Sequence, residues 1–317
     1  MSNNLRTLGN RQLFPIGMGC MKISANAPDV VLDPARIETM TQLIHGALDL
    51  GVNLFDTADI YAPTWKMFGH NETFIADAVR SWNGDSSKVV IATKGGLVRN
   101  PGEVWGRQGL VEYLLRAAEA SAGRMQVDKI GLWMQHRLDL NIPFETQVES
   151  VLAVRERGIA ENVGVSNYSP EQLIKAIEIG GKPEQGGIAS VQNEFNPKYR
   201  QHAEIIQICA ENGIAFIPFV PVASNARYGR NGIEDLPVFT AMAQAKGVSN
   251  YALTMAWHLR HSPCVIPIPG ATKLSSIQDS VTGADLELTD AEFDQLNQSL
   301  PESAPLHEEL IAQPAFR

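Results

Sequence analysis

The stretch Gly51–Tyr61, which reads GVNLFDTADIY, decides the fold of this chain. The residues VNLF form a short, mainly apolar run that leads directly into Asp56, and the chain then becomes polar and irregular before Tyr61. A short, nearly continuous apolar run is typical of a strand buried on both faces of a parallel sheet. The sequence therefore predicts a buried parallel strand that ends at Asp56, with Tyr61 on the loop that follows it.

Two further apolar runs also end in polar side chains. Val89–Thr93 leads into Lys94, and Ile130–Met134 is followed within two residues by His136. Any one of these groups alone is more often a loop cap, a surface charge or a structural histidine than a functional residue. An Asp, a Tyr, a Lys and a His at the carboxyl ends of consecutive strands would converge if the strands were parallel neighbours in a barrel. The four together favour a catalytic site.

The alternation of strand and helix patterns continues along the whole chain. The expected strands are Ile16–Cys20, the run ending at Asp56, the run ending at Lys94, the run ending near Gln135, the run ending near Ser166, Ile188–Gln192, Ala215–Val220 and Cys264–Pro267. The expected helices include Arg36–Leu50, Asn71–Ser81, Gly109–Arg124, Phe144–Arg157, one opened by Pro170, and Asn250–Arg260. Eight such units predict a single domain over residues 1–317 with an α/β, (β/α)₈ TIM-barrel fold.

Elements outside the eight units are expected at both ends of the chain. Leu5–Phe14 is split by Gly9-Asn10 and predicts a β-hairpin, whereas Ala25–Asp33 is expected to be a polar loop. Extra helices near the C-terminus are expected at Asp235–Lys246 and Asp290–Ser299. A doubly wound sheet is the alternative fold. It is disfavoured because strand 1 is followed by no glycine-rich GxGxxG turn.

Composition indicates a soluble globular enzyme. The 317 residues are 44% hydrophobic and 19% charged, and they contain no run of about eighteen apolar residues of the kind that spans a membrane. The net charge of −9 argues against nucleic acid as a partner. The N-terminus lacks the apolar core of a signal peptide, so a cytoplasmic protein is expected. The three cysteines show no metal-ligand spacing and are interpreted as reduced core residues, with no metal site.

Six motifs, in order, resemble those of the aldo-keto reductase superfamily, and the resemblance covers nearly the whole chain. They are DTADIY (Asp56–Tyr61), ATKGG (Ala92–Gly96), MQHRLD (Met134–Asp139), GVSNYS (Gly164–Ser169), VQNEFN (Val191–Asn196) and IPIPGAT (Ile266–Thr272). The resemblance implies a barrel closed at its bottom by the N-terminal hairpin. It also implies an NAD(P)H-dependent oxidoreductase that reduces a small-molecule aldehyde or ketone to an alcohol, as a monomer or small homo-oligomer.

The resemblance assigns a role to each of the four converging side chains. Tyr61 would donate the proton to the carbonyl oxygen, although a free phenol has a pKa of about 10 and is a reluctant acid. Lys94 is expected to lower the pKa of Tyr61, and Asp56 would serve as the counter-ion of Lys94. His136 would donate a hydrogen bond to the substrate oxygen and orient it.

Other motifs resemble a nicotinamide site. Ser166, Asn167 and Gln192 would hold the carboxamide, whose donors and acceptor suit three polar groups at neighbouring strand ends. Phe219 stands where the family usually has a Tyr that stacks on the nicotinamide, so stacking is expected to survive the loss of the hydroxyl. The phosphate-binding residues implied by the resemblance are Gly270, Thr272, Lys273 and Asp279. Lys273 is the candidate for a 2′-phosphate contact, so NADPH/NADP is the expected cofactor.

Departures from the family pattern leave cofactor preference and substrate open. Ser276 and Ser280 replace a basic residue or His and an Asn that the family commonly has, which keeps NADH in consideration. The loop Ala62–Asn71 is longer than the short glycine-rich link that the family usually has there, and the loop Gly95–Gln108 is a second departure. They carry aromatic and apolar residues that could wall an apolar substrate pocket, namely Trp65, Met67, Phe68 and Trp105.

Two other functions fit part of the sequence. A lysine-dependent aldolase would use Lys94 as a Schiff base, but that chemistry gives the GVSNYS, VQNEFN and IPIPGAT motifs no role. A nicotinamide-binding subunit that senses redox state or scaffolds a partner, like the potassium-channel β subunits, would keep the cofactor site with little turnover. The intact Asp, Tyr, Lys and His favour turnover.

Overall fold

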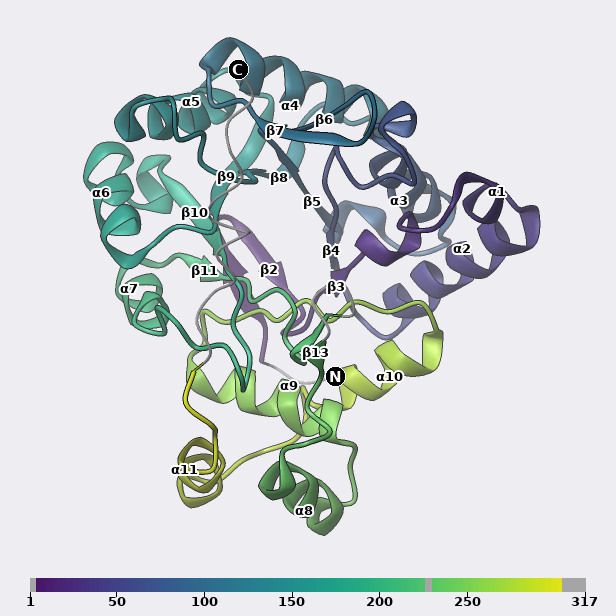
Figure 1. Ribbon diagram of the computed structural model, residues 1–317, viewed down its shortest axis with the longest axis vertical. Helices are drawn as coiled ribbons and strands as arrows, with labels where there is room; N and C mark the ends of the chain where they lie inside the picture. Colours follow the sequence, from purple (N-terminus) through teal and green to yellow (C-terminus); the bar gives the residue numbers. More distant parts are fainter. Residues whose placement is uncertain (1–3, 226–229, 304–317) are drawn as a thin grey trace.

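The structure of this chain, a computed structural model, describes residues 4–225 and 230–303. Its central feature is a parallel sheet with the strand order β11-β10-β9-β8-β5-β4-β3. The sheet curls, and helices surround it on its outer face (Figure 1). The strands are β3 (Met18–Gly19), β4 (Leu54–Asp56), β5 (Val90–Gly95), β8 (Ile130–Gln135), β9 (Ala160–Ser166), β10 (Ile188–Gln192) and β11 (Ala215–Phe216).

The helices alternate with these strands, as the sequence predicts. They are α1 (Pro28–Val31), α2 (Pro34–Asp49), α3 (His70–Ser81), α4 (Val111–Met125), α5 (Phe144–Glu156), α6 (Pro170–Gly180), α7 (Ile205–Asn212), α8 (Pro237–Lys246), α9 (Asn250–His261), α10 (Leu274–Thr282) and α11 (Asp290–Gln298). The extra helices α8 and α11 are confirmed within two residues at each end. No helix in the described part of the chain combines the length and the apolarity needed to cross a lipid bilayer.

Local sequence explains where several helices begin and end. The side chain of Asp33 accepts the backbone N–H of Ala35 at the start of α2, and Gly51, at φ +94°, follows the end of that helix. Ser169 and Gln172 form a capping box at α6, with Pro170 at the first helical position. Such caps satisfy backbone groups that have no partner inside the helix.

The predicted seventh and eighth strands are shorter or less regular than expected. Ala215–Val220 contains only β11, and the predicted strand Cys264–Pro267 is not a regular strand. The reason is proline: Pro218 lies in one segment, and Pro267 and Pro269 lie in or beside the other. Proline has no N–H and cannot donate to a ladder of sheet hydrogen bonds.

Residues 264–270 nevertheless hydrogen-bond to both edges of the curled sheet. On one side, the N–H of Ile266 donates to the oxygen of Phe216 at 2.8 Å. On the other, the N–H of Gly17 donates to the oxygen of Pro267 at 2.9 Å. Isolated bridges join the same segment to β11 and to β3. The segment therefore lies between the two ends of the sheet.

Three of the apolar clusters fill the inside and the outside of the sheet. One cluster lies within the curl and combines residues of the hairpin, the strands and the 264–270 segment: Leu8, Leu13, Leu54, Val90, Ala92, Leu132, Met134, Ala215, Ile217, Ile266 and Ile268. The other two clusters join the strands to the helices. Trp133 is fully buried in one of these outer clusters, so alternation along β8 points it away from the inner cluster.

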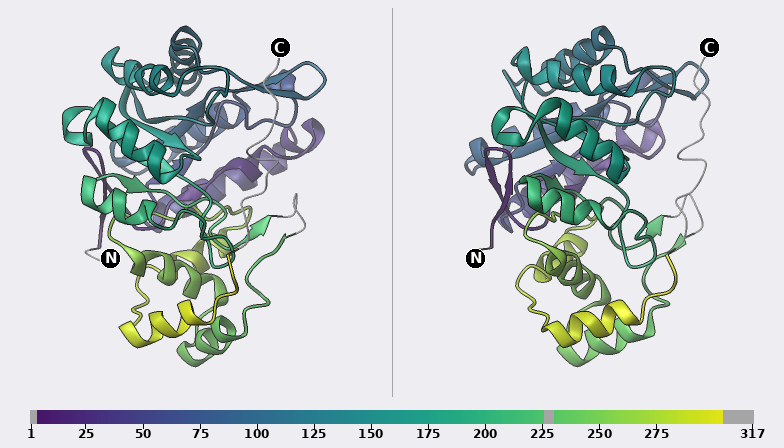
Figure 2. Two further views of the ribbon diagram at one scale, coloured as in Figure 1. Left: turned by 60° about the vertical axis from the view of Figure 1, so that its left-hand side comes forward. Right: turned by 90° about the vertical axis from the view of Figure 1, so that its left-hand side faces the viewer.

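The N-terminal hairpin is confirmed as β1 (Arg6–Leu8) paired with β2 (Arg11–Leu13). Its turn uses Gly9 at φ +53°, where a Cβ would lie 1.8 Å from the Asn162 side chain. The buried guanidinium of Arg6 donates to the backbone oxygens of Leu259 and Ser262. The hairpin lies at the opposite end of the sheet from the pair β12 (Ser224–Asn225) and β13 (Arg230–Asn231) (Figure 2).

Two expected loops contain regular structure. Ala25–Asp33 includes the single-turn helix α1, and Gly95–Gln108 includes a second hairpin, β6 (Leu97–Asn100) with β7 (Val104–Arg107). The first segment contains Pro28 and the second contains four glycines, so both sequences are typical of loops and local pattern predicted neither element.

Candidate active site

Parallel pairing brings three of the predicted polar positions to one end of the sheet. Asp56 is the last residue of β4, Lys94 lies one residue before the end of β5, and His136 directly follows β8. β4 pairs with β5 and β5 pairs with β8, all parallel, with Lys94 in register with Met134. The carboxyl ends of these strands therefore meet at the same edge, as the sequence predicts.

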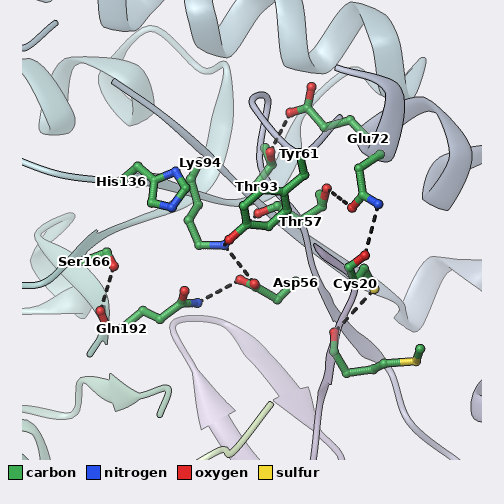
Figure 3. A network of polar contacts seen from close by, with 12 residues as sticks. Cys20, Asp56, Thr57, Tyr61, Glu72, Thr93, Lys94, His136, Ser166 and Gln192 are labelled. Carbon is green, nitrogen blue, oxygen red and sulfur yellow. Dashed lines mark hydrogen bonds and ion pairs between the residues drawn. The ribbon is translucent and has the colours of Figure 1, made fainter. Parts of the chain in front are cut away.

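Lys94 is the centre of the polar network in Figure 3. It is fully buried, and its Nζ donates to Asp56 Oδ1 at 2.8 Å, to the backbone oxygen of Thr57 at 2.7 Å and to the Tyr61 hydroxyl at 3.4 Å. An ammonium has three N–H donors, so all three have an acceptor. The second carboxylate oxygen of Asp56 accepts the Gln192 amide N–H at 2.8 Å. Both ends of the ion pair are thus fixed in place.

Burial and neighbouring charges together set the pKa values of Tyr61 and Lys94. Burial raises the pKa of Tyr61, and the opposing pull of Lys94 does not cancel it, so the net pKa lies above 10.0. Lys94 lowers the pKa of Tyr61, as the sequence predicts, but the larger effect of burial, which the sequence does not show, raises the net value. Burial would lower the pKa of Lys94, but Asp56 and Tyr61 together outweigh it and the net pKa is raised. At neutral pH Tyr61 is therefore a protonated phenol beside a charged ammonium.

His136 faces Tyr61 across the site. The two rings meet edge to face with centroids 5.8 Å apart. Burial lowers the pKa of His136 well below 6.5, and the charges of Lys94 and Arg137 lower it further. Its Nδ1 is buried and has no hydrogen-bond partner among the described residues. A neutral imidazole can donate one hydrogen bond to an oxygen without adding charge to the site.

The three residues predicted to hold a carboxamide lie together at the ends of β9 and β10. Ser166 Oγ donates to the backbone oxygen of Gln192 at 2.8 Å, and Asn167 Nδ2 donates to Ser166 Oγ at 2.8 Å. Asn167 also donates to the backbone oxygen of His136 at 3.3 Å. The backbone of Asn167 is left-handed, at φ +63°, a conformation that Asn tolerates better than most residues. These contacts join the predicted cofactor residues to the group around Lys94.

Phe219 lies beyond β11 on a constrained segment. Its N–H donates to the backbone oxygen of Asn193 at 3.0 Å, and its ring packs against the inner apolar cluster. Val220 follows at φ +50°, which is strained for a β-branched side chain. Asn196 Nδ2 donates to the oxygen of Val220 at 3.1 Å. These hydrogen bonds fix the backbone position from which the Phe219 ring projects.

The predicted phosphate-binding residues surround the start of α10. Gly270 is exposed, Thr272 is half-buried, and Lys273 is the exposed N-cap residue of that helix. Asp279 instead accepts a hydrogen bond at 2.6 Å from Ser249, the N-cap residue of α9. Asp279 therefore has a structural contact that joins α10 to α9, in addition to the cofactor role that the sequence predicts.

The residues expected to wall a substrate pocket separate into two groups. Met67 and Phe68 line a cavity of about 620 Å³ against α2 and α3. Trp65 and Trp105 are half-buried, and Trp105 packs under the guanidinium of Arg99 at 5.3 Å. Met67 and Phe68 thus face α2 and α3, whereas Trp105 packs on the β6–β7 hairpin, and a role of the four residues in a substrate pocket stays a prediction.

Sequence reasoning missed a second buried polar network beside the first. Glu72 is fully buried, forms an ion pair with Arg124 at 2.5 Å and accepts the hydroxyl of Thr93, the neighbour of Lys94. Asp59 is also fully buried, and burial followed by the charge of Glu72 raises its pKa well above 3.8. The acidic residues of DTADIY and of the α3 start were visible in the sequence, but their burial was not.

These features define an α/β protein with a buried, hydrogen-bonded Lys-Asp-Tyr group and a His at the carboxyl ends of its parallel strands. The model of the Aldo/keto reductase family matches residues 15–301, and the chain belongs to this family of oxidoreductases.

Individual relatives support the same assignment. An uncharacterized oxidoreductase of Schizosaccharomyces pombe is 28% identical over 92% of this chain and 88% of its own length. Pyridoxine 4-dehydrogenase of Escherichia coli is 26% identical over 92% of this chain and 96% of its own. The solved aldo-keto reductase of Klebsiella pneumoniae, in complex with NADPH, shares the fold with a TM-score of 0.76 at 22% identity, covering 95% of this chain and 97% of that one.

Proposed function

We propose that this protein reduces an aldehyde or ketone to an alcohol, with hydride from NADPH and a proton from Tyr61. The observation that carries the proposal is the position of Lys94 Nζ, 2.8 Å from Asp56 and 3.4 Å from the Tyr61 hydroxyl. The NADPH complex of the Klebsiella relative and the dehydrogenase name of the Escherichia coli relative point in the same direction.

The fold proposed with this function is a closed (β/α)₈ barrel. Residues 264–270 would take the eighth position, because they hydrogen-bond to β11 on one side and to the segment before β3 on the other. A closed barrel would leave the edge strands paired and would hold the strand ends in a fixed ring. The catalytic distances would then be set by the barrel and not by the loops.

The residues present fit a nicotinamide cofactor. Gln192 uses its amide N–H for Asp56, which leaves its carbonyl oxygen to accept from a carboxamide, while Ser166 and Asn167 supply hydroxyl and amide groups. Phe219 would stack on the ring. At the other end, Gly270 has no side chain to block a phosphate, and the space beside it is open, with the nearest described protein atom 3.6 Å from where a Cβ would lie. Thr272 and Lys273 would bind the phosphates at the start of α10.

The proton chemistry follows from the pKa directions. When bound, the cofactor supplies a hydride to the carbonyl carbon, and the electron pair of the C=O bond moves to oxygen. Tyr61, which burial keeps protonated, then gives its proton to that oxygen. The phenolate that remains is stabilised by the Lys94 ammonium, which Asp56 keeps charged. His136, neutral because burial lowers its pKa, would orient the oxygen through one hydrogen bond.

A substrate panel tests the proposal. Purified protein should oxidise NADPH in the presence of aromatic aldehydes, small aldehydes or pyridoxal, and NADH should be compared in parallel. Tyr61→Phe should abolish turnover and leave the NADPH dissociation constant unchanged, because only the proton donor is lost. Lys273→Met should weaken NADPH binding and spare NADH if the lysine contacts the 2′-phosphate.

Other outcomes would support the alternatives. Tight NADPH binding without turnover of any aldehyde or ketone would favour a redox-sensing or scaffolding subunit. Trapping of Lys94 by borohydride with a carbonyl substrate would favour an aldolase. The ion pair of Lys94 with Asp56 opposes the aldolase, since a Schiff-base lysine must be neutral to attack a carbonyl.

A further inference from the structure

The β6–β7 hairpin is a separate two-stranded sheet that follows β5 on the side where the strands end. It lies near α3 and α4 (Figure 1), at the end of the molecule opposite the β1–β2 hairpin (Figure 2). An isolated two-stranded hairpin is only marginally stable in water. Contacts outside the pair must therefore fix its position.

Register places two arginines on one face of this hairpin. Arg99 is opposite Trp105, and Arg107 is opposite Leu97, so all four side chains project to the same side. Both arginines are largely buried, at 11% exposure for the Arg99 side chain and 9% for Arg107. Burying a guanidinium costs free energy unless its N–H groups have acceptors, so each arginine must hydrogen-bond to the segments that cover it.

Arg99 attaches the hairpin to the loop that follows Tyr61. Its guanidinium donates to the backbone oxygens of Ala62 at 2.6 Å and Pro63 at 3.1 Å, and it pairs with Glu103. Glu103 in turn accepts the backbone N–H of Trp65 at 3.0 Å. The backbone oxygens of the first two residues after Tyr61 are thus bound to β6 through the side chain of Arg99.

Arg107 attaches the other strand to the loop that follows His136. Its Nη1 donates to the backbone oxygen of Leu138 at 2.9 Å. Two residues farther along, the backbone N–H of Gly109 donates to Asp139 at 3.2 Å. Burial lowers the pKa of Arg107, and nearby Asp139 opposes that shift. The hairpin is therefore attached on one side to the loop of Tyr61 and on the other to the loop of His136.

We propose that the β6–β7 hairpin is a brace that fixes Tyr61 and His136 relative to each other, with Arg99 and Arg107 as its positioning residues. The proposal rests on the proposed carbonyl reduction, because it assigns these loops to the proton donor and to the group that orients the substrate oxygen. Neither arginine touches the reacting atoms. Each acts through the backbone of one catalytic loop.

Paired substitutions separate the two halves of the brace. Arg99→Met and Arg107→Met keep much of the apolar stem and remove the fork of N–H donors. Each should lower kcat by about 10- to 100-fold, the loss expected when a catalytic group is displaced by a fraction of an ångström to an ångström. The NADPH dissociation constant should stay within about twofold of wild type, because neither side chain belongs to the carboxamide or phosphate residues. Arg99→Lys should not restore kcat, since Arg99 reaches Glu103, Ala62 and Pro63 through three separate nitrogens of a planar fork, and a single ammonium nitrogen cannot occupy those three positions.

Hydrogen–deuterium exchange supplies a readout that does not depend on turnover. Arg99→Met should speed amide exchange in residues 61–67 and leave 136–141 at the wild-type rate, and Arg107→Met should do the reverse. Arg116→Met is the matched control and should change neither region, because Arg116 is an exposed arginine on α4 that donates to the Glu112 backbone oxygen of its own helix. Glu103→Gln, which loosens Arg99 and Trp65 without removing an arginine, repeats the test if Arg99→Met fails to fold.

The outcomes are distinguishable. Folded variants with wild-type kcat, or with exchange that rises equally in both loops, would overturn the brace. A wild-type protein that reduces no carbonyl would refute the proposed function, and the loop-specific exchange pattern would still decide whether the hairpin fixes the two loops.

Discussion

The buried ion pair between Lys94 and Asp56 leads to the sharpest prediction. The charged atoms are 2.8 Å apart, and both side chains are almost fully buried. At that separation the attraction amounts to about 6 kcal/mol for an effective dielectric constant of about 20. Desolvation cancels part of this attraction. Lys94→Met leaves Asp56 charged with only the Gln192 amide as a described side-chain partner, and removing one partner of a buried pair costs about 3–5 kcal/mol.

Urea unfolding of four proteins measures the pair: wild type, Lys94→Met, Asp56→Asn and the double variant. Each single variant should lose several kcal/mol of unfolding free energy, because each leaves one buried charge without its partner. The double variant should lose less than the sum of the singles by at least about 2 kcal/mol, because neither charge is then stranded. Lys175→Met, which removes an exposed pair with Glu178, is the matched control and should unfold like wild type.

The pH of the measurement follows from the pKa of Lys94. Because its folded pKa is raised above the ordinary value, its stabilising contribution is fully present below about pH 10.4 and is lost only as pH rises through the folded value. The four proteins are therefore compared near pH 7.5. The ion pair would be refuted as the centre of this site if the losses of the two single variants added up to that of the double variant, or if Lys94→Met were as stable as wild type.

Three further predictions concern other parts of the structure. Ser169→Ala removes the cap of α6 and should lower the unfolding free energy by about 1 kcal/mol in urea unfolding, whereas an unchanged midpoint would contradict the capping box. Burial lowers the pKa of His258 to about 3. Its protonation in the unfolded chain should therefore destabilise the fold by about 2 kcal/mol between pH 7 and pH 5, and His258→Gln should flatten that pH dependence of unfolding. Phe219→Ala should raise the NADPH dissociation constant about 2- to 12-fold, measured by fluorescence titration, through loss of stacking, and an unchanged constant would place the cofactor elsewhere.

Local pattern alone was enough to predict the strand ends and most helices. β10 has the predicted bounds, and β4 ends at Asp56 as expected. A strand buried on both faces is a nearly continuous apolar run, so the first polar residue after the run marks its end. Once the strands are parallel neighbours, the convergence of Asp56, Lys94 and His136 follows from geometry. The contacts within the site therefore agree with a prediction made from residue order.

Where hydrogen bonding depends on distant segments, the sequence was less informative. Residues 264–270 show no regular strand because Pro267 and Pro269 lack donors, yet they bond to both sheet edges. The β6–β7 hairpin was hidden in a segment that reads as a loop, since its position depends on Arg99 and Arg107 reaching two other loops. Local sequence propensity does not depend on such distant partners and therefore cannot predict the elements that they stabilise.

The sequence by itself determined the order of the strands and helices and the side chains that lie at the strand ends, because apolar period and capping act over a few residues. Only the tertiary structure decided how those side chains behave as acids and bases. The backbone oxygen of Thr57 is the third hydrogen-bond acceptor of Lys94. Burial raises the pKa of Tyr61 by more than Lys94 lowers it, so the net pKa is raised. Desolvation and Coulomb attraction depend on what surrounds a group in space, and residues far apart in the chain supply those surroundings.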